Sequence, residues 1–395
     1  MSDHNVLVVA PRSPLPLKSG AQLRIFHTVK ELSKKFDVSL VYLIQNGEGK
    51  NEVNKLKEMG INPYQVHHTC SKRSGLLRFG LSTNTYRVSK FKNPQFGKKV
   101  RSVIKTNSFD FIWVHFLTTL ALIPQSLPSP LILDQHNADV EYWETFREGS
   151  ILERIFAVVN QRRLRKLQNK KGPKIDAILS VSEEDADATR GQIEDTPVWV
   201  TPNGVDLSKF QANTSDSNSS NTVSFIGSLD RPRNEEAVKW FAEESWPTVY
   251  NKNPEAEFHI VGRNPTSEVS SLGSTPGVNV IGEVPEVVPI YNQSDVIVAP
   301  FLLGGGTKLK VLEALAMERA LVSTPKGCTG IDVTDGKDAV IRERDEDFSG
   351  AIINLLNDSR RRKEIGKSGR RFVEKNYSWD AIMDDTISKI KGELL

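Results

Sequence analysis

Residues 299–324 read APFLLGGGTKLKVLEALAMERALVST, which predicts the end of a strand, a glycine-rich turn, a helix and a second strand. The apolar run at 295–300 is long enough for a buried parallel strand. Gly304, Gly305 and Gly306 can take backbone angles closed to other residues and let a ligand approach the main chain closely. Thr307 stands where a helix N-cap belongs, and good helix formers follow it from 308 to 317.

This turn has the features of an anion site. Flexible glycines that open onto free helical N–H groups favour anions, and Lys308 adds a full positive charge. Glu313 lies about a turn and a half further along the predicted helix, where a carboxylate is well placed to accept two hydroxyls of a sugar such as ribose. From the spacing alone, an ordinary glycine-rich turn followed by a solvated glutamate is an equal interpretation.

The run GGGTKLKVLEALA at 304–316 resembles the donor-binding segment of the retaining glycosyltransferases of family four, which have the two-domain GT-B fold. In that family two glutamates usually stand eight positions apart. The second, matched by Glu313, binds the ribose of the nucleotide, and the first contacts the donor sugar. Gly305 occupies the first position here, as in a subgroup of family-four-like transferases with a Gly-Gly-Thr-Arg/Lys loop. Sugar specificity therefore does not transfer from the better-known members.

Length and composition describe two domains of a soluble protein. The chain has 395 residues, of which 38% are hydrophobic and 26% charged, which is enough for a sizeable core in each domain. Cys70 and Cys328 are the two cysteines, which excludes a disulfide framework and fits a reducing cytosol. We expect no signal peptide, because no basic region precedes the short apolar run near the N-terminus. We expect no membrane span either, because the most apolar long window, 109–124, contains Asp110 and His115.

Positive charge is concentrated in the first half of the chain. Residues 1–200 hold 29 Lys and Arg against 20 Asp and Glu, a net charge of +9, and the remainder has a net charge of −6. Between Lys72 and Lys105 stand ten Lys or Arg and no Asp or Glu, with leucines and aromatic residues among them. A solvated basic face and an anionic membrane surface are equal interpretations of this basic block. We expect no nucleic-acid partner, because no RNA- or DNA-binding signature accompanies the block.

The first half alternates predicted strands and helices. Short apolar runs predict buried strands at 5–10, 37–44, 109–114, 130–134 and 177–181. A helix is expected from about Leu23 to Phe36, and a long polar helix from about Val140 to Lys171. The resemblance implies that Gly20, in the loop before the first helix, approaches the donor phosphates and that Arg24 lies nearby.

The strand at 130–134 runs directly into the sequence QHNADVE at 135–141. The resembled family places a histidine at such a strand end, facing the donor sugar, and His136 matches it. Asn137 and Glu141 match the continuation found in the subgroup. A capping or core histidine is the usual interpretation in an unknown fold, but a strand end that faces a cleft favours contact with a ligand.

In the second half the predicted strands end in glycine or proline, which puts loops at the carboxyl edge, where open α/β sheets bind ligands. These strands are expected at 222–226, 257–261, 278–281 and 295–300. The resemblance implies that Arg263 faces the diphosphate and that the loop 282–286, with Gly282 and Val284, brackets the base. Gly227 belongs to the same implied donor site.

Two Asp-x-Asp triplets, Asp185/Asp187 and Asp345/Asp347, lie in predicted first turns of helices. Acidic residues are common there because they complement the helix dipole. We therefore reject both triplets as metal ligands and expect no metal and no cofactor beyond the nucleotide-sugar co-substrate.

The resemblance extends over nearly the whole chain and implies an α/β protein with a GT-B fold, in which two Rossmann-like domains have parallel sheets that face an interdomain cleft. We expect an N-terminal acceptor-side domain at 1–200, a nucleotide-sugar-binding domain at 201–376, and a helix at 377–395 that crosses back to the first domain. The polar segment at 211–221 marks the boundary.

The implied activity is a retaining, metal-independent glycosyltransferase of the hexosyltransferase type, which transfers a sugar from a nucleotide-sugar to a glycan or lipid-linked acceptor. It would act in polysaccharide biosynthesis for the cell envelope, in the cytoplasm or at the inner face of the plasma membrane. No nucleophile is evident. The resemblance implies front-face chemistry, in which Arg263 and Lys308 stabilise the departing diphosphate and His136 faces the donor sugar, and these three are the expected catalytic residues. Gly306 and Thr307 complete the expected donor loop. Two alternatives stay open: a sugar-nucleotide epimerase, which would act on the donor alone, and a catalytically silent nucleotide-sugar binder.

Overall fold

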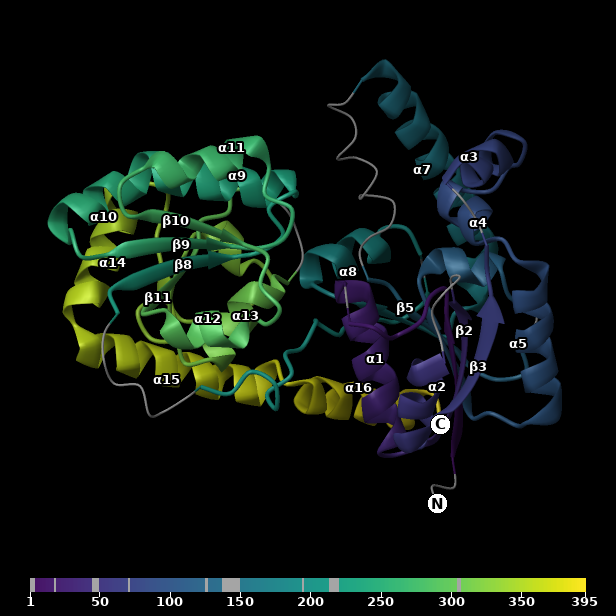
Figure 1. Ribbon diagram of the computed structural model, residues 1–395. Helices are drawn as coiled ribbons and strands as arrows, with labels where there is room; N and C mark the ends of the chain where they lie inside the picture. Colours follow the sequence, from purple (N-terminus) through teal and green to yellow (C-terminus); the bar gives the residue numbers. More distant parts are fainter. Residues whose placement is uncertain are drawn as a thin grey trace. The chain divides into compact units, whose positions relative to one another are not determined.

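The computed structural model describes residues 4–17, 19–44, 50–69, 72–124, 127–136, 150–193, 195–212, 220–303 and 307–395. The chain forms two compact units. Unit 1 consists of residues 1–202 together with 383–395, and unit 2 consists of residues 203–382. Each has its own parallel sheet with helices on both faces (Figure 1). The expected α/β class and the two Rossmann-like domains with parallel sheets are confirmed.

Unit 1 is built on a seven-stranded parallel sheet in the order β3-β2-β1-β4-β5-β6-β7. Its strands are β1 (Asn5–Ala10), β2 (Asp37–Ile44), β3 (Asn62–His67), β4 (Phe111–His115), β5 (Leu131–Asp134), β6 (Ala177–Ser180) and β7 (Val198–Val200). Along β1, Leu7 and Val9 enter one hydrophobic core, whereas Val6 and Val8 enter the core on the other face. Burial on both faces explains why these strands are continuous apolar runs.

Seven α-helices are described in unit 1 before its C-terminal segment, within the ranges given above. They are α1 (Gly20–Ser33), α2 (Lys50–Glu58), α3 (Lys72–Gly80), α4 (Tyr86–Phe91), α5 (Pro94–Thr106), α7 (Ile151–Lys171) and α8 (Glu183–Arg190), with short 3-10 turns at Leu117–Ala121 and Gly172–Lys174. Ser150 caps α7 through a capping box with Glu153. The part of the predicted long helix that falls on 140–149, like Asn137 and Glu141, lies outside the described residues.

Unit 2 is built on a six-stranded parallel sheet in the order β10-β9-β8-β11-β12-β13. Its strands are β8 (Thr222–Ile226), β9 (Glu257–Val261), β10 (Val278–Gly282), β11 (Val296–Ala299), β12 (Ala320–Ser323) and β13 (Val340–Ile341). Its helices are α9 (Pro232–Trp240), a π-helical turn (Phe241–Ser245), α10 (Trp246–Lys252), α11 (Ser267–Ser271), α12 (Val288–Gln293), α13 (Leu309–Ala316), α14 (Glu346–Asn357) and α15 (Ser359–Asn376), with 3-10 turns at Leu272–Ser274 and Pro325–Cys328. In Figure 1, α9 and α11 cover one face of the sheet, and α12 and α13 cover the other.

The strand order changes direction once in each sheet. In unit 1 this switch point lies between β1 and β4, and in unit 2 it lies between β8 and β11. Open parallel sheets bind ligands at the carboxyl ends of the strands beside such a point. A ligand site is therefore expected in the loops after these four strands.

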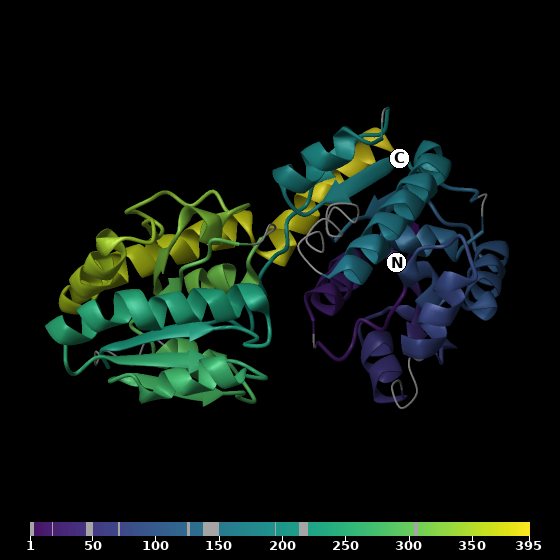
Figure 2. The same cartoon turned by 90° about the horizontal axis from the view of Figure 1, so that it is seen from above.

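The last helix, α16 (Trp379–Glu393), starts in unit 2 and ends in unit 1. Met383, Ile387 and Ile390 are buried in the core of unit 1 that also holds β1 and β2, and Figure 2 shows this helix from above. No helix in the described part of the chain is long and apolar enough to cross a membrane.

Two helix starts differ from the sequence-based prediction. The first helix begins at Gly20, because the Ser19 side chain accepts a hydrogen bond from the Gln22 amide and caps it there. Thr307 is not an N-cap: α13 begins at Leu309, with Lys308 in the cap position and without a side-chain cap. Lys308 keeps an extended backbone, and its side chain turns into the interior of unit 2.

Candidate functional site

The carboxyl edge of the unit 1 sheet holds a buried ion pair. Asp134, the last residue of β5, is fully buried, and its Oδ1 accepts a hydrogen bond from Arg24 Nε at 2.8 Å. Arg24 lies on α1 and also donates from Nη1 to the carbonyl of Pro202 at 3.1 Å. A buried carboxylate needs such a partner, since an unpaired buried charge is very costly. The structure thus places Arg24 inside unit 1 as the counter-ion of Asp134.

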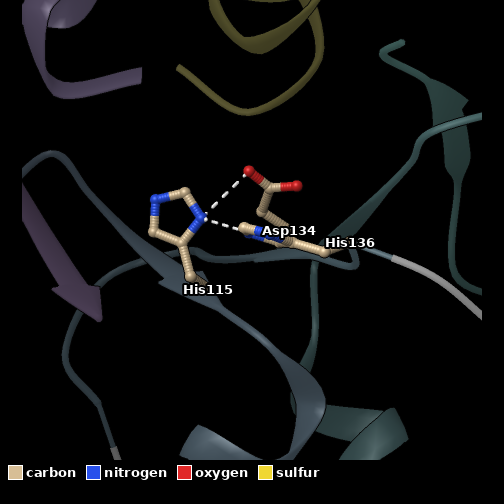
Figure 3. Close-up of side chains that lie close together, drawn as sticks. All are labelled: His115, Asp134 and His136. Carbon is tan, nitrogen blue, oxygen red and sulfur yellow. Dashed lines mark hydrogen bonds and ion pairs between the residues drawn. The ribbon is translucent and has the colours of Figure 1, made fainter. Parts of the chain in front are cut away.

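Two histidines join this ion pair (Figure 3). His115 ends β4, and its Nδ1 lies 3.1 Å from Asp134 Oδ2 and 3.0 Å from His136 Nε2. A carboxylate only accepts hydrogen bonds, so His115 Nδ1 carries the proton. His136 Nε2 is then an acceptor, and neutral His136 carries its own proton on Nδ1. The cluster therefore fixes His136 as a neutral ring with one N–H donor.

The pKa values of Asp134 and His136 both lie below their usual values, for different reasons. Burial raises the pKa of Asp134, but the charge of Arg24 and the hydrogen bond from His115 outweigh burial and hold that pKa well below its usual value. The pKa of His136 lies well below its usual value, because burial disfavours the imidazolium and outweighs the attraction of Asp134. Arg24 and Arg12 act in the same direction as burial. His136 is thus uncharged near neutral pH.

Phe116 holds the ring of His136 in place. It follows β4, has the positive φ of 68°, and stacks on His136 with ring centroids 3.9 Å apart. A positive φ is costly for an aromatic residue and is found where the surroundings impose it, often at functional sites. The Phe116 amide donates to the carbonyl of Asp134 at 2.9 Å, which fastens this conformation to β5.

By residue type, His115, Asp134 and His136 could also hold a metal ion, since one ligand atom from each lies within 4.8 Å of the others. Their hydrogen bonds point to another use. Both oxygens of Asp134 already accept hydrogen bonds, Oδ1 from Arg24 and Oδ2 from Trp113 Nε1 at 3.3 Å and from His115. A cation would also stand beside the Arg24 guanidinium. The donor set therefore suits shared protons better than a metal.

In unit 2, Lys310 lies at the switch point of the sheet. Its Nζ lies 4.4 Å from the ring centroid of Phe225 on β8 and 4.8 Å from that of Phe301, which follows β11. It also donates to Asn234 Oδ1 at 3.2 Å. Burial, and after it the charge of Arg233, lowers the pKa of Lys310 from 10.5 to about 7. A lysine in this state gains strongly from the arrival of an anion.

Glu313 lies on the same helix, one turn beyond Lys310. Its Oε2 accepts a hydrogen bond from the hydroxyl of Tyr291, a buried residue of α12, at 3.0 Å. Burial raises the pKa of Glu313, and the Tyr291 hydrogen bond works against that rise. The contact with Tyr291 holds the carboxylate in one orientation, as a site for sugar hydroxyls requires.

The loops after β8, β9 and β10 meet at the same edge. The Gly227 amide donates to the Val261 carbonyl, and the Gly262 amide donates to the Gly282 carbonyl at 2.8 Å. A side chain at Gly262 would collide with the Gly227 carbonyl, because a Cβ there would lie only 1.6 Å from its oxygen. Arg263 Nε donates to the Ser228 hydroxyl at 3.1 Å. The structure thus brings together three residues that were predicted from separate motifs: Gly227, Arg263 and Gly282.

Two other residues predicted for the donor site pack toward the interior of unit 2. Val284, half-buried, packs against the core of unit 2. Lys308 is buried, and its Nζ donates to the carbonyl of Lys326 at 2.8 Å. Gly305 and Gly306 lie outside the described residues.

Sequence reasoning missed several residues of these clusters. No motif marks His115, which lies just beyond the predicted strand 109–114, or Asp134, which ends the predicted strand 130–134, although a histidine and an aspartate at adjacent strand ends are a signal for a site. Lys310 was counted among helix formers, and Tyr291 has no signal in sequence because its partner lies on another helix.

Two family models match the chain. The model described as Glycosyltransferase Family 4 matches residues 18–209, and the model described as Glycosyl transferases group 1 matches residues 220–358. A Klebsiella pneumoniae protein described as an uncharacterized 44.6 kDa protein in cps region is 24% identical over 94% of this chain and 96% of its own length. A Corynebacterium glutamicum protein is 24% identical over 75% of this chain and 80% of its own. It is described as a GDP-mannose-dependent monoacylated alpha-(1-6)-phosphatidylinositol monomannoside mannosyltransferase.

Solved structures share the fold. HepE of Anabaena in complex with UDP-glucose superposes with a TM-score of 0.65 at 14% identity, covering 98% of this chain and 100% of that chain. Sucrose-phosphate synthase of Thermosynechococcus elongatus superposes with a TM-score of 0.69 at 13% identity, with the same coverage of both chains.

Proposed function

Because this chain is a glycosyltransferase of the family-four type with a GT-B fold, we propose that it transfers a sugar from a nucleotide-sugar to a glycan or lipid-linked acceptor, with retention and without a metal. The observation that carries this proposal is the group of Lys310, Glu313 and Arg263 at the switch point of unit 2. It combines cations for a diphosphate with an oriented carboxylate for a ribose.

Similarity to known proteins supports the donor class. HepE of Anabaena has been solved with UDP-glucose, and the Corynebacterium relative is GDP-mannose-dependent. Both ligands are a nucleoside diphosphate joined to a hexose. The features that they share, a diphosphate and a ribose, are those that the unit 2 residues suit.

The proposed mechanism rests on the departing diphosphate. As the bond to the sugar breaks, negative charge grows on the diphosphate, and preorganised cations at that position lower the barrier. Arg263, Lys308 and Lys310 are assigned this role. The charge of Lys308 is among those that lower the pKa of Lys310, so these two cations lie close enough to repel each other. A diphosphate between them would relieve that repulsion.

His136 is assigned the donor sugar. Its neutral ring offers a hydrogen bond from Nδ1 without placing a positive charge beside the sugar, and His115, Asp134 and Phe116 hold it in place. Orientation of this kind is worth much in catalysis, because the ring need not be ordered during the reaction.

For the acceptor side we assign the basic block 72–105 to an anionic membrane surface at the inner face of the plasma membrane. The structure offers supporting contacts: α3, within this block, packs against α7 through Phe79 and Phe156, whose ring centroids lie 4.9 Å apart. Exposed aliphatic side chains gather on these two helices and just after α3: Leu76, Leu77, Leu81, Ile151, Leu152, Ile155 and Val158. Aliphatic side chains beside basic ones suit a lipid interface.

A panel of UDP-, GDP- and dTDP-sugars in a thermal-shift assay tests the donor class. A ligand at about 100 times its dissociation constant adds about 2.7 kcal/mol of stability and raises the melting temperature. The best donor is then incubated with glycan and lipid-linked acceptors, with and without EDTA, and the anomeric configuration of the product is read by NMR. Product formed without any acceptor indicates an epimerase. Loss of activity in EDTA, restored by Mg²⁺ or Mn²⁺, refutes the metal-free mechanism.

A further inference from the structure

Unit 1 contains a small pocket at the carboxyl ends of β1, β2 and β3. Its volume is about 240 Å³, and its walls come from the loop after β1, from α1, and from α4. The lining residues are Pro11, Arg12, Ser13, Gln22, Leu43, His68, Lys90 and Phe91. None of these lining residues is acidic, whereas Arg12 and Lys90 are cationic. The pocket lies beside the switch point of the sheet, where ligands are expected.

The Arg12 guanidinium has one buried donor without a partner among the described residues. Its Nε is buried and, within the described ranges, has no hydrogen-bond acceptor. Burial lowers the pKa of Arg12, and the charge of Arg87, on α4, lowers it further. Glu52 does not line the pocket, but it accepts a hydrogen bond at 3.3 Å from the hydroxyl of Ser13, which does. Buried donors are almost always satisfied, so an unsatisfied Nε of Arg12 within the influence of a second guanidinium charge points to a bound anion.

We propose that this pocket binds a phosphate group of the acceptor. Arginine is the side chain best suited to phosphate, because its planar fork donates two parallel hydrogen bonds to two oxygens. Lys90 and Arg87 stand three residues apart on α4 and bring two further charges to the same side of that helix. His68 shapes the wall, with its Nε2 donating to the Lys90 carbonyl at 2.8 Å, which ties β3 to α4.

The volume and the surroundings of the pocket separate it from the donor site. A cavity of about 240 Å³ is smaller than the usual range for drug-sized ligands and holds a phosphate with part of a sugar, whereas a complete nucleotide-sugar needs more room. The pocket also connects to the residue assigned to the sugar. The Arg12 guanidinium carbon lies 5.9 Å from the ring centroid of Phe116, and Phe116 stacks on His136.

This inference rests on the proposed function, because an acceptor is a substrate only of a transfer reaction. Its test uses two acceptors that carry the same sugar, one as an alkyl diphosphate and one as an alkyl glycoside without phosphate. With saturating donor, the wild type is expected to prefer the diphosphate acceptor. Arg12→Gln should raise KM for that acceptor about tenfold to a hundredfold, the loss expected for a charge-assisted hydrogen bond. KM for the donor and for the alkyl glycoside should stay unchanged.

Controls address charge and folding. Arg12→Lys keeps the charge but loses the fork, so an intermediate KM is expected. Lys57→Ala removes an exposed charge of α2 outside the pocket and outside the basic block, and should leave KM for both acceptors unchanged. Inorganic phosphate should compete with the diphosphate acceptor in the wild type and no longer in Arg12→Gln. Competition with the donor instead, or an unchanged acceptor KM in Arg12→Gln, overturns the proposal.

Direct binding separates this inference from the proposed reaction. Inorganic phosphate and an alkyl phosphate are titrated by calorimetry into protein already saturated with nucleoside diphosphate. If both ligands bind to the wild type and to Lys57→Ala but not to Arg12→Gln, the pocket is supported even if no transfer is detected. Binding of the alkyl phosphate alone assigns the site to a lipid-linked source, and binding of neither overturns the proposal.

Discussion

Replacing Lys310 with methionine should remove a pH dependence from donor binding. Its amine lies between the rings of Phe225 and Phe301, and burial lowers its pKa to about 7. Near neutral pH about half of the molecules therefore carry an uncharged amine. A bound diphosphate favours the ammonium, so binding should draw a proton onto Lys310 whenever the amine starts neutral.

The size of the effect follows from that pKa. Below about pH 7 the amine is already protonated, and affinity hardly changes with pH. Above it, each pH unit costs about 1.4 kcal/mol, which is tenfold in the dissociation constant, for as long as the bound lysine stays charged. From about pH 7 to about pH 9 the loss should reach about 50-fold. The diphosphate of a nucleotide-sugar keeps its charge across this range, so the ligand adds no titration of its own.

Calorimetry in two buffers of different ionisation enthalpy measures the protons taken up on binding. We expect nearly one proton per donor in the wild type at about pH 8 and almost none in Lys310→Met. Lys308→Met is the matched control. It should keep the uptake and move its midpoint to higher pH, because the charge of Lys308 is one of those that lower the pKa of Lys310. A flat affinity from pH 7 to 9, or uptake that survives in Lys310→Met, would refute the assignment of Lys310 to the diphosphate.

The same lysine affects stability. Its folded pKa lies below its unfolded value of 10.5, so the unfolded chain holds more protons between about pH 7 and pH 10.5. Stability should therefore rise with pH across this window. The full shift corresponds to about 5 kcal/mol, which we reduce to about 2 kcal/mol because the side chain is only half-buried. Denaturant titrations should show this rise in the wild type and its absence in Lys310→Met.

Three further predictions concern other parts of the chain. Glu313→Gln should weaken nucleotide binding about tenfold or more, and a 2′,3′-dideoxy nucleotide should lose little further on that variant; additive losses in calorimetry would mean that Glu313 does not contact the ribose. His136→Ala should leave nucleoside diphosphate binding within about 0.5 kcal/mol and lower transfer about a hundredfold, whereas equal losses in both assays would move His136 into the nucleotide site. The wild type should sediment with vesicles made of equal parts of phosphatidylcholine and phosphatidylglycerol, and the double variant Leu152→Ser, Ile155→Ser should not. Leu395→Ser, which changes an exposed leucine elsewhere, should still sediment. If the wild type does not sediment at low salt, the assignment of a membrane surface is refuted.

The fold was predictable because its strands are buried on both faces. The runs at 5–10, 37–44, 222–226 and 257–261 are strands with the predicted bounds, since a continuous apolar segment closed by glycine or a polar residue has few other solutions. The predicted start of α13 was wrong by one residue. The preference of Thr307 for the N-cap position was outweighed by the burial of Lys308. That burial depends on a hydrogen bond to the distant Lys326 carbonyl, which the local sequence does not indicate.

The candidate site was predictable only where a backbone requirement or a motif marks it. Gly227 and Gly282 indicate loops after predicted strands, and Glu313 stands at a recognisable distance along the sequence from the glycine-rich turn. The protonation of a side chain depends instead on neighbours from distant parts of the chain. Arg24 and Asp134 are 110 residues apart, and the low pKa of His136 arises from its burial, which outweighs the attraction of Asp134 and is reinforced by the charges of His115 and Arg24. Periodicity and spacing carry no information about such a network.

The placement of α16 has a consequence for synthesis on the ribosome. Met383, Ile387 and Ile390 belong to the core of unit 1, yet all of unit 2 is translated before them. At about 5 to 20 residues per second, the 180 residues of unit 2 take about 10 to 40 seconds to make. During this interval the apolar surface that later receives α16 has no cover from its own chain. Nascent unit 1 is therefore the stage at which a chaperone has most to bind, and a ribosome stalled within unit 2 should expose this surface to proteases.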